Sequence, residues 1–179
     1  SKRDDPRVAD PVLKESALLT NVFNRLARSC FYEAQKSFGS NMPIGAVSPA
    51  VVRKAHAVMA DYDRTMHKVE LHSIMALMDE FIRWSNKYWA DGIKQAELSG
   101  DDGARRQVLA DSFFLLRVCT LLMHPIVPAG TETICDYLNF QFDDFFSWNY
   151  DFNDMAELCS AGEIIEGAHR VCELPPRFD

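Results

Sequence analysis

Glycine and proline are scarce in this chain, which contains eight of each among its 179 residues. An all-β architecture needs many tight turns, and these two residues form a large share of them. No run of 18 apolar residues occurs, so the sequence offers no candidate membrane-spanning segment. The first residues, SKRDDPRVADP, also lack the apolar core of a secretory signal peptide. These absences favour a helical protein without a membrane partner.

Patterns that bind metals are missing as well. The five cysteines contain no Cys-x-x-Cys pair, and their odd number argues against a disulfide framework. His67 and His72 are five residues apart and lack the helical Glu-x-x-His spacing of a carboxylate-bridged metal site. We therefore expect reduced cysteines in a cytoplasmic protein and no metal in this chain.

Positive charge is in deficit, with 19 Lys and Arg against 26 Asp and Glu and a net charge of −7. Most nucleic-acid-binding domains are basic, so DNA is not an expected partner and any RNA contact requires a local patch. The sequence contains no glycine-rich phosphate loop and no Gly-x-Ser-x-Gly element. Adjacent acidic pairs such as Asp79-Glu80 and Asp143-Asp144 are expected to be solvated. We therefore expect no catalytic residues in this chain.

Helical periodicity dominates the sequence. Apolar residues recur at helical spacing from Leu18 to Phe38, and Asp10-Pro11 supplies an N-cap followed by proline at the first helical position. Ser48-Pro49 repeats that signature before a second helix. A polar stretch predicts a break near 63–66, and a third helix is expected over about 68–89 with a stop or kink after it at Asp91-Gly92. A fourth helix over about 104–123 and a short helix over 132–138 complete the predicted elements.

These elements predict an all-α helical bundle of four main helices and a short fifth. The bundle is expected to occupy residues 11–179, behind a flexible N-terminal tail at residues 1–10. No internal repeat occurs, and no alternation typical of a strand is sustained.

The first helix carries a candidate binding site. Asn24 and Arg28 are four residues apart, so their side chains project from the same side one turn apart, with Arg25 beside them. An amide and a guanidinium together offer several donors and one acceptor. That combination suits the edge of a nucleobase with a phosphate nearby. Spacing alone leaves two interpretations open, a solvated polar stripe and a nucleotide-binding one.

A second candidate is aromatic and lies near the end of the third predicted helix. Trp84 and Tyr88 are four residues apart, and Trp89 follows directly, with Arg83 and Lys87 nearby. Exposed rings flanked by positive charges are typical of surfaces that stack on splayed bases. Packing in the core is the alternative, above all for the large ring of Trp84.

Several short motifs, taken in order, resemble the C-terminal anticodon-binding domain of methionyl-tRNA synthetase, a class I aminoacyl-tRNA synthetase. NVFNRLARS resembles the family's Asn-x-x-x-Arg pattern. RVCTLLMHPIVPAGTETICDYL is similar to its element of a helix, Pro-x-x-Pro and a second helix. The other motifs that carry the resemblance are IMALMDEF, Asn86-Lys87-Tyr88, FSWN and LPPRFD. Their order and spacing extend the resemblance over residues 12–179.

The resemblance implies recognition of a tRNA anticodon. Asn24 and Arg28 match the family residues that hold the CAU anticodon of methionine tRNA, where a tryptophan stacks on the bases. The family's Pro-Trp pair is absent here, and Trp89, the nearest aromatic residue, is the candidate for this stacking role. Arg25, Arg83 and Lys87 are candidate contacts to the tRNA backbone.

The family's catalytic signatures, resembling His-Ile-Gly-His and Lys-Met-Ser-Lys-Ser, are absent from all 179 residues. The resemblance therefore implies a longer parent ligase that attaches methionine to tRNA with ATP, and no cofactor in this chain. The parent's own catalytic domain is then an expected partner. Two alternatives stay open: the equivalent domain of a valine, isoleucine, leucine or cysteine enzyme, and a helical protein–protein adaptor that docks through the aromatic segment 139–150.

Overall fold

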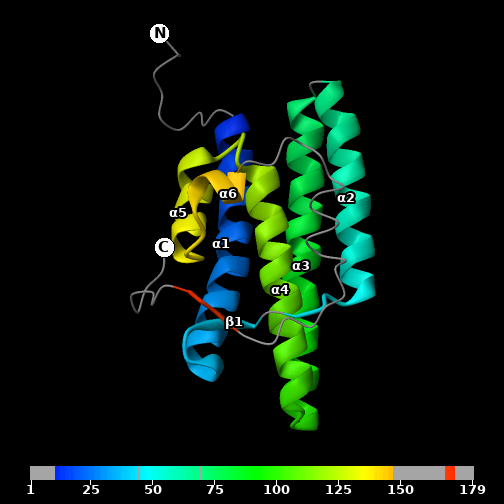
Figure 1. The fold of residues 1–179 in the computed structure, drawn as a ribbon. Coiled ribbons are helices and arrows are strands. Elements are labelled where there is room, and N and C mark those ends of the chain that lie inside the picture. The colour runs from blue at the N-terminus through cyan, green and yellow to red at the C-terminus, as the bar shows by residue number, and fades with distance from the viewer. Residues whose placement is uncertain (1–10, 44, 69, 147–167, 172–179) are drawn as a thin grey trace.

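A computed structural model describes residues 11–43, 45–68, 70–146 and 168–171, and it confirms the all-α prediction (Figure 1). Four long helices form the body: α1 (Pro11–Phe38), α2 (Pro49–His67), α3 (Leu71–Ser99) and α4 (Asp102–Met123). The shorter elements are α5 (Pro128–Tyr137), α6 (Phe142–Phe146), β1 (Asn41–Pro43) and β2 (Ala168–Arg170). Within the described ranges, no helix combines the length and apolar character needed to cross a bilayer.

The four long helices alternate in direction, and α3 and α4 form the central pair (Figure 1). α1 packs on one side of this pair and α2 on the other. The chain between α1 and α2 crosses the bundle where β1 lies against α4, and α3 and α4 extend beyond this crossing (Figure 1). From residue 17 onward, α1 keeps a row of exposed side chains on one face, among them Asn21, Arg25 and Lys36.

The apolar face predicted for α1 is confirmed as core from Leu19 onward, whereas its first predicted residue, Leu18, is 51% exposed. Leu26, Cys30 and Phe31 are fully buried, and the Phe31 ring makes edge-on contacts with Phe113 of α4 and Tyr137 of α5. This ring therefore joins three helices at one point in the core.

Three cysteines are free and buried, as expected for reduced core residues: Cys30, Cys119 and Cys135. Burial raises the pKa of the Cys30 and Cys119 thiols above its ordinary range. Both groups are consequently kept as neutral thiols. Cys159 and Cys172 lie outside the described residues.

The break predicted near residues 63–66 does not occur, because α2 continues to His67. Polar side chains in this stretch bond within their own helix. Arg64 pairs with Asp61, and the Thr65 hydroxyl donates to the Asp61 carbonyl at 2.7 Å. The polarity of this segment therefore marks an exposed helical turn and not a loop.

The stop or kink predicted at Asp91-Gly92 is also wrong. α3 runs through Gly92 to Ser99 and ends at Gly100, whose φ of 64° lies in the left-handed region. A Cβ atom at Gly92 would lie only 2.4 Å from Cγ2 of Val108 on α4. The glycine is therefore explained by the close approach of two helices.

A short antiparallel strand pair, which the sequence did not predict, joins the C-terminal part of the chain to the bundle. β1 pairs with β2, and Met42 lies opposite His169. The next residue, Val171, donates its backbone N–H to the Ser40 carbonyl at 3.0 Å and buries its side chain in the core. Three residues on each strand are too few to show a periodic signal.

Candidate nucleic-acid interface

Asn24 and Arg28 lie on the outer side of α1, and both side chains are half-buried. Neither makes a hydrogen bond or ion pair with another described residue of the chain. The core face of the helix, at Leu26 and Ala27, holds the backbone between them in place. An amide and a guanidinium are thus held one turn apart with their polar groups unengaged by the described protein.

Arg25 is exposed and lies at the other edge of this outer side. Successive helical residues are turned by about 100°, so Arg25 points well away from Asn24. The edge near Arg25 faces α3, because the Asn86 amide donates to the carbonyl of Val22, one turn before Arg25, at 3.0 Å. The three residues therefore spread across one surface of α1.

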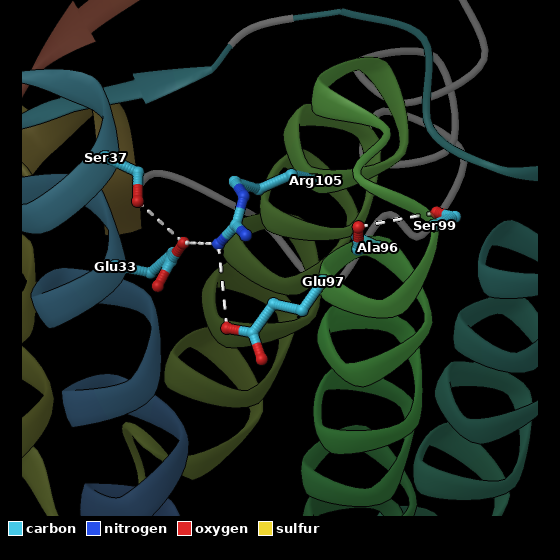
Figure 2. A network of polar contacts seen from close by, with 6 residues as sticks. All are labelled: Glu33, Ser37, Ala96, Glu97, Ser99 and Arg105. Atoms are coloured by element: carbon cyan, nitrogen blue, oxygen red, sulfur yellow. Dashed lines mark hydrogen bonds and ion pairs between the residues drawn. The ribbon is translucent and has the colours of Figure 1, made fainter.

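Between residues 17 and 38, α1 carries no exposed carboxylate. Its only carboxylate there is Glu33, which is 8% exposed and accepts hydrogen bonds from Arg105 at 2.6 Å and Ser37 at 2.9 Å (Figure 2). Glu97 lies 3.8 Å from the same guanidinium nitrogen. The hydrogen bond to Glu33 raises the pKa of Arg105, which stays positively charged. Glu33 is thereby neutralised, and the positive charges of α1 are left unbalanced.

Arg83 and Lys87, the predicted backbone contacts on α3, are engaged in ion pairs within their own helix. The Arg83 Nε lies 3.1 and 2.9 Å from the two carboxylate oxygens of Asp79, and the Lys87 Nζ lies 2.7 Å from Asp91. Exposed pairs of this kind contribute only about 0–1 kcal/mol. Because each of these cations is paired with a carboxylate, the surface of α3 around Arg83 and Lys87 is close to neutral, whereas the outer side of α1 is positive.

The structure places the predicted stacking residue Trp89 in the core, at 9% exposure. Its spacing of four from Ser85 and seven from Ile82 continues the buried stripe of α3. Trp84 is half-buried and stacks on Tyr88, with ring centroids 5.6 Å apart, while the Lys54 ammonium lies 5.5 Å from its centroid. These rings are already engaged by the protein itself.

A buried carboxylate on α4 was not anticipated. Asp111 is fully buried and accepts four hydrogen bonds, from the Ser48 N–H and hydroxyl, the Tyr88 hydroxyl and the Gln107 amide. Burial and this carboxylate together raise the pKa of Tyr88 to about 12. An acid inside the most apolar helix was the available signal in the sequence. Asp111 on α4 therefore links Ser48, at the end of the α1–α2 connection, to Tyr88 on α3 through hydrogen bonds that it accepts from both.

An open pocket of about 260 Å³ lies between α1, at Leu18 and Leu19, and the first half of α3. Its lining combines apolar and charged side chains, namely Leu18, Leu19, His72, Met75, Ala76, Asp79 and Arg83. Among the described residues, no three His, Cys, Asp or Glu side chains are arranged to hold a metal ion.

The aromatic segment proposed for an adaptor falls only partly within the described residues, which end at Phe146 before resuming at Ala168. Phe145 is buried, and Phe146 stacks on His124 with centroids 4.1 Å apart. Phe142 is 49% exposed. Within the described part of this segment, Phe145 and Phe146 therefore pack against the bundle and Phe142 stays exposed.

No protein-family model matches the chain, and no curated protein sequence matches it. The family resemblance therefore rests on the short motifs of the sequence.

Proposed function

We propose that this chain binds the anticodon loop of methionine tRNA through the outer side of α1. It would act as the anticodon-binding domain of a methionyl-tRNA synthetase, a longer ligase that attaches methionine to tRNA with ATP. The observation that carries the proposal is the pair Asn24 and Arg28, one turn apart and unengaged by the described protein. The ordered sequence motifs and the all-α bundle support the same assignment.

The two side chains supply complementary chemistry to a base. The Asn24 amide offers a donor and an acceptor to a Watson–Crick edge, and the Arg28 guanidinium offers a planar fork of donors. Unstacked bases of an RNA loop expose the edges that such groups recognise. We infer that these two residues read bases, because both side chains are partly exposed on a helix whose opposite face is buried in the core.

The charge distribution favours a localised contact over general binding to RNA. The net charge of −7 repels polyanions, whereas Arg25, Arg28 and Lys36 concentrate positive charge on α1. A tRNA would therefore approach this helix in preference to the remaining surface. Ion pairing also makes Arg83 and Lys87 secondary contacts at most.

The proposal is tested by the affinity for an RNA stem-loop with CAU in its loop. Arg28→Ala and Asn24→Ala should weaken binding, roughly tenfold or more for Arg28, because hydrogen bonds to a charged group are worth about 1.5–3 kcal/mol. Lys94→Ala is the matched control, since Lys94 is exposed on α3 and has no assigned role. Melting temperatures should stay nearly unchanged in all three. Equal affinity of wild type and Arg28→Ala would show that α1 does not hold the anticodon.

A further inference from the structure

The pocket between α1 and α3 is lined mainly by apolar side chains, which are Leu18, Leu19, Met75 and Ala76. Leu18 is exposed, and Leu71, another exposed leucine, lies one helical turn before Met75 on the same side of α3. The described residues expose only four large apolar side chains, and two of them therefore belong to this region. Exposed apolar surface that gathers around a cavity is typical of a binding site.

Arg83 lines the same pocket and has part of its hydrogen-bonding capacity unused. Its Nε lies 3.1 and 2.9 Å from the two oxygens of Asp79, the only carboxylate among the described lining residues. The two terminal nitrogens of Arg83 make no hydrogen bond or ion pair with a described residue. Asp79 therefore holds the guanidinium by one nitrogen, and the fork of terminal N–H groups is left for a ligand.

The volume of the pocket limits the ligand to one small apolar group. About 260 Å³ exceeds the ~150 Å³ of an apolar cavity that takes benzene, and it lies below the ~300 Å³ at which drug-sized sites begin. A single ring with a short tail fits this range. A docked amphipathic helix would instead need a row of anchor positions along a groove.

We propose that this pocket binds a small monocarboxylate with an apolar body. The body would lie against the two leucines of α1 and Met75, and the carboxylate would accept two parallel hydrogen bonds from the terminal nitrogens of Arg83. Guanidinium and carboxylate match each other in this planar geometry. The inference is independent of RNA binding, because neither Asn24 nor Arg28 lines the pocket.

The test uses hydrocinnamate, a phenyl ring on a short chain that ends in a carboxylate, and follows the amide NMR shifts of the full chain. Wild type should bind it saturably with a Kd of roughly 1–10 mM, as expected for a ligand of this size. The shifts should concentrate at residues 18–19 and 72–83. Hydrocinnamamide, the neutral amide with the same body, should bind at least about fivefold more weakly because it cannot form the charge-assisted pair.

Two variants test the polar and the apolar part of the site separately. Arg83→Gln should weaken hydrocinnamate to the affinity of the amide and leave binding of the amide unchanged. Leu18→Ser should weaken both compounds at least about threefold, because apolar contact area is lost. Leu98→Ser is the matched control, since Leu98 is an exposed leucine outside the pocket lining, and it should leave both affinities unchanged. Melting temperatures measured alongside should show that all three variants remain folded.

Each contrary result overturns a stated part of the inference. Equal affinity for the acid and the amide, or the same preference for the acid in Arg83→Gln, would overturn the contact between Arg83 and the carboxylate. Equal weakening by Leu18→Ser and Leu98→Ser, or shifts that map away from α1 and α3, would overturn the location. A lack of saturable binding of hydrocinnamate would overturn the whole inference, while the proposed anticodon contact is tested separately with RNA.

Discussion

Asp111 on α4 accepts hydrogen bonds from both the backbone N–H and the hydroxyl of Ser48, at 2.9 and 2.6 Å. Ser48 immediately precedes α2, and its side chain does not cap that helix. The start of α2 is therefore anchored by another helix, through a single buried carboxylate that holds the last residue of the α1–α2 connection.

Asp111→Asn should lower the free energy of unfolding by about 1–3 kcal/mol. An amide keeps one acceptor oxygen and turns an NH₂ group toward buried donors, which leaves at least one of them without a partner. Chemical denaturation measures the change. Asp143→Asn, at an exposed position of α6, is the control and should change stability by less than ~0.5 kcal/mol. Equal effects at both positions would contradict the structural role of Asp111.

Tyr88 should lose its proton near pH 12, whereas an unperturbed tyrosine does so near pH 10. The folded protein holds this proton more tightly than the unfolded chain. Its contribution to stability is therefore complete below about pH 10 and is lost as the pH rises toward 12. Tyr88→Phe should flatten the fall in stability across that interval, as followed by denaturation and by tyrosinate absorbance. An unchanged slope in the variant would show that Tyr88 is not the group responsible.

Gly92→Ala should destabilise the protein although alanine is the better helix former by ~1 kcal/mol. The added methyl would lie 2.4 Å from a γ-carbon of Val108, and the β-branched side chain has little freedom to rotate away. Overpacking of this kind costs about 1–3 kcal/mol.

A double mutant checks the cause of that loss. A Val108→Ala background removes the 2.4 Å contact and leaves only the Cβ of residue 108, 3.2 Å from the added methyl, so Gly92→Ala should be clearly less destabilising there. Gly130→Ala in α5, where a Cβ meets nothing within 4 Å, should stabilise the wild type. Destabilisation of similar size in both backgrounds would exclude the contact as the cause.

Local sequence patterns were sufficient for much of this fold. The apolar spacing from Leu18 to Phe38 and the Asp10-Pro11 signature together predicted α1, and Pro49 marked the start of α2. The stop expected at Gly92 was wrong because a glycine in a helical sequence can mark either the end of the helix or a close contact with another helix. Only the position of Val108, 16 residues later, distinguishes the two roles.

The candidate site was predictable only where one helix determines it. Asn24 and Arg28 share a side of α1 by spacing alone, and the structure keeps them there. The burial of Trp89 also had a local signal, its register with Ile82 and Ser85. The pairing of Arg105 with Glu33 had none, because it depends on how α4 packs beside α1.

Ser112→Ala should raise stability by up to ~1 kcal/mol. Ser112 is fully buried, and its hydroxyl has no hydrogen-bond partner among the described residues. Removing an unsatisfied buried polar group removes its desolvation cost. Ser85→Ala is the matched comparison, since that hydroxyl donates to the Phe81 carbonyl at 2.9 Å. Both changes gain the same helix propensity, so Ser112→Ala should be the more favourable of the two, and the reverse order would refute the assignment.

The most direct test of the central proposal changes the RNA and leaves the protein untouched. The affinity of this chain for a stem-loop carrying CAU is compared with that for the same stem-loop carrying GAU. If α1 reads methionine anticodon bases, CAU should bind at least about fivefold more tightly, the factor for one ~1 kcal/mol hydrogen bond. Equal affinity for the two loops would contradict anticodon recognition by this chain.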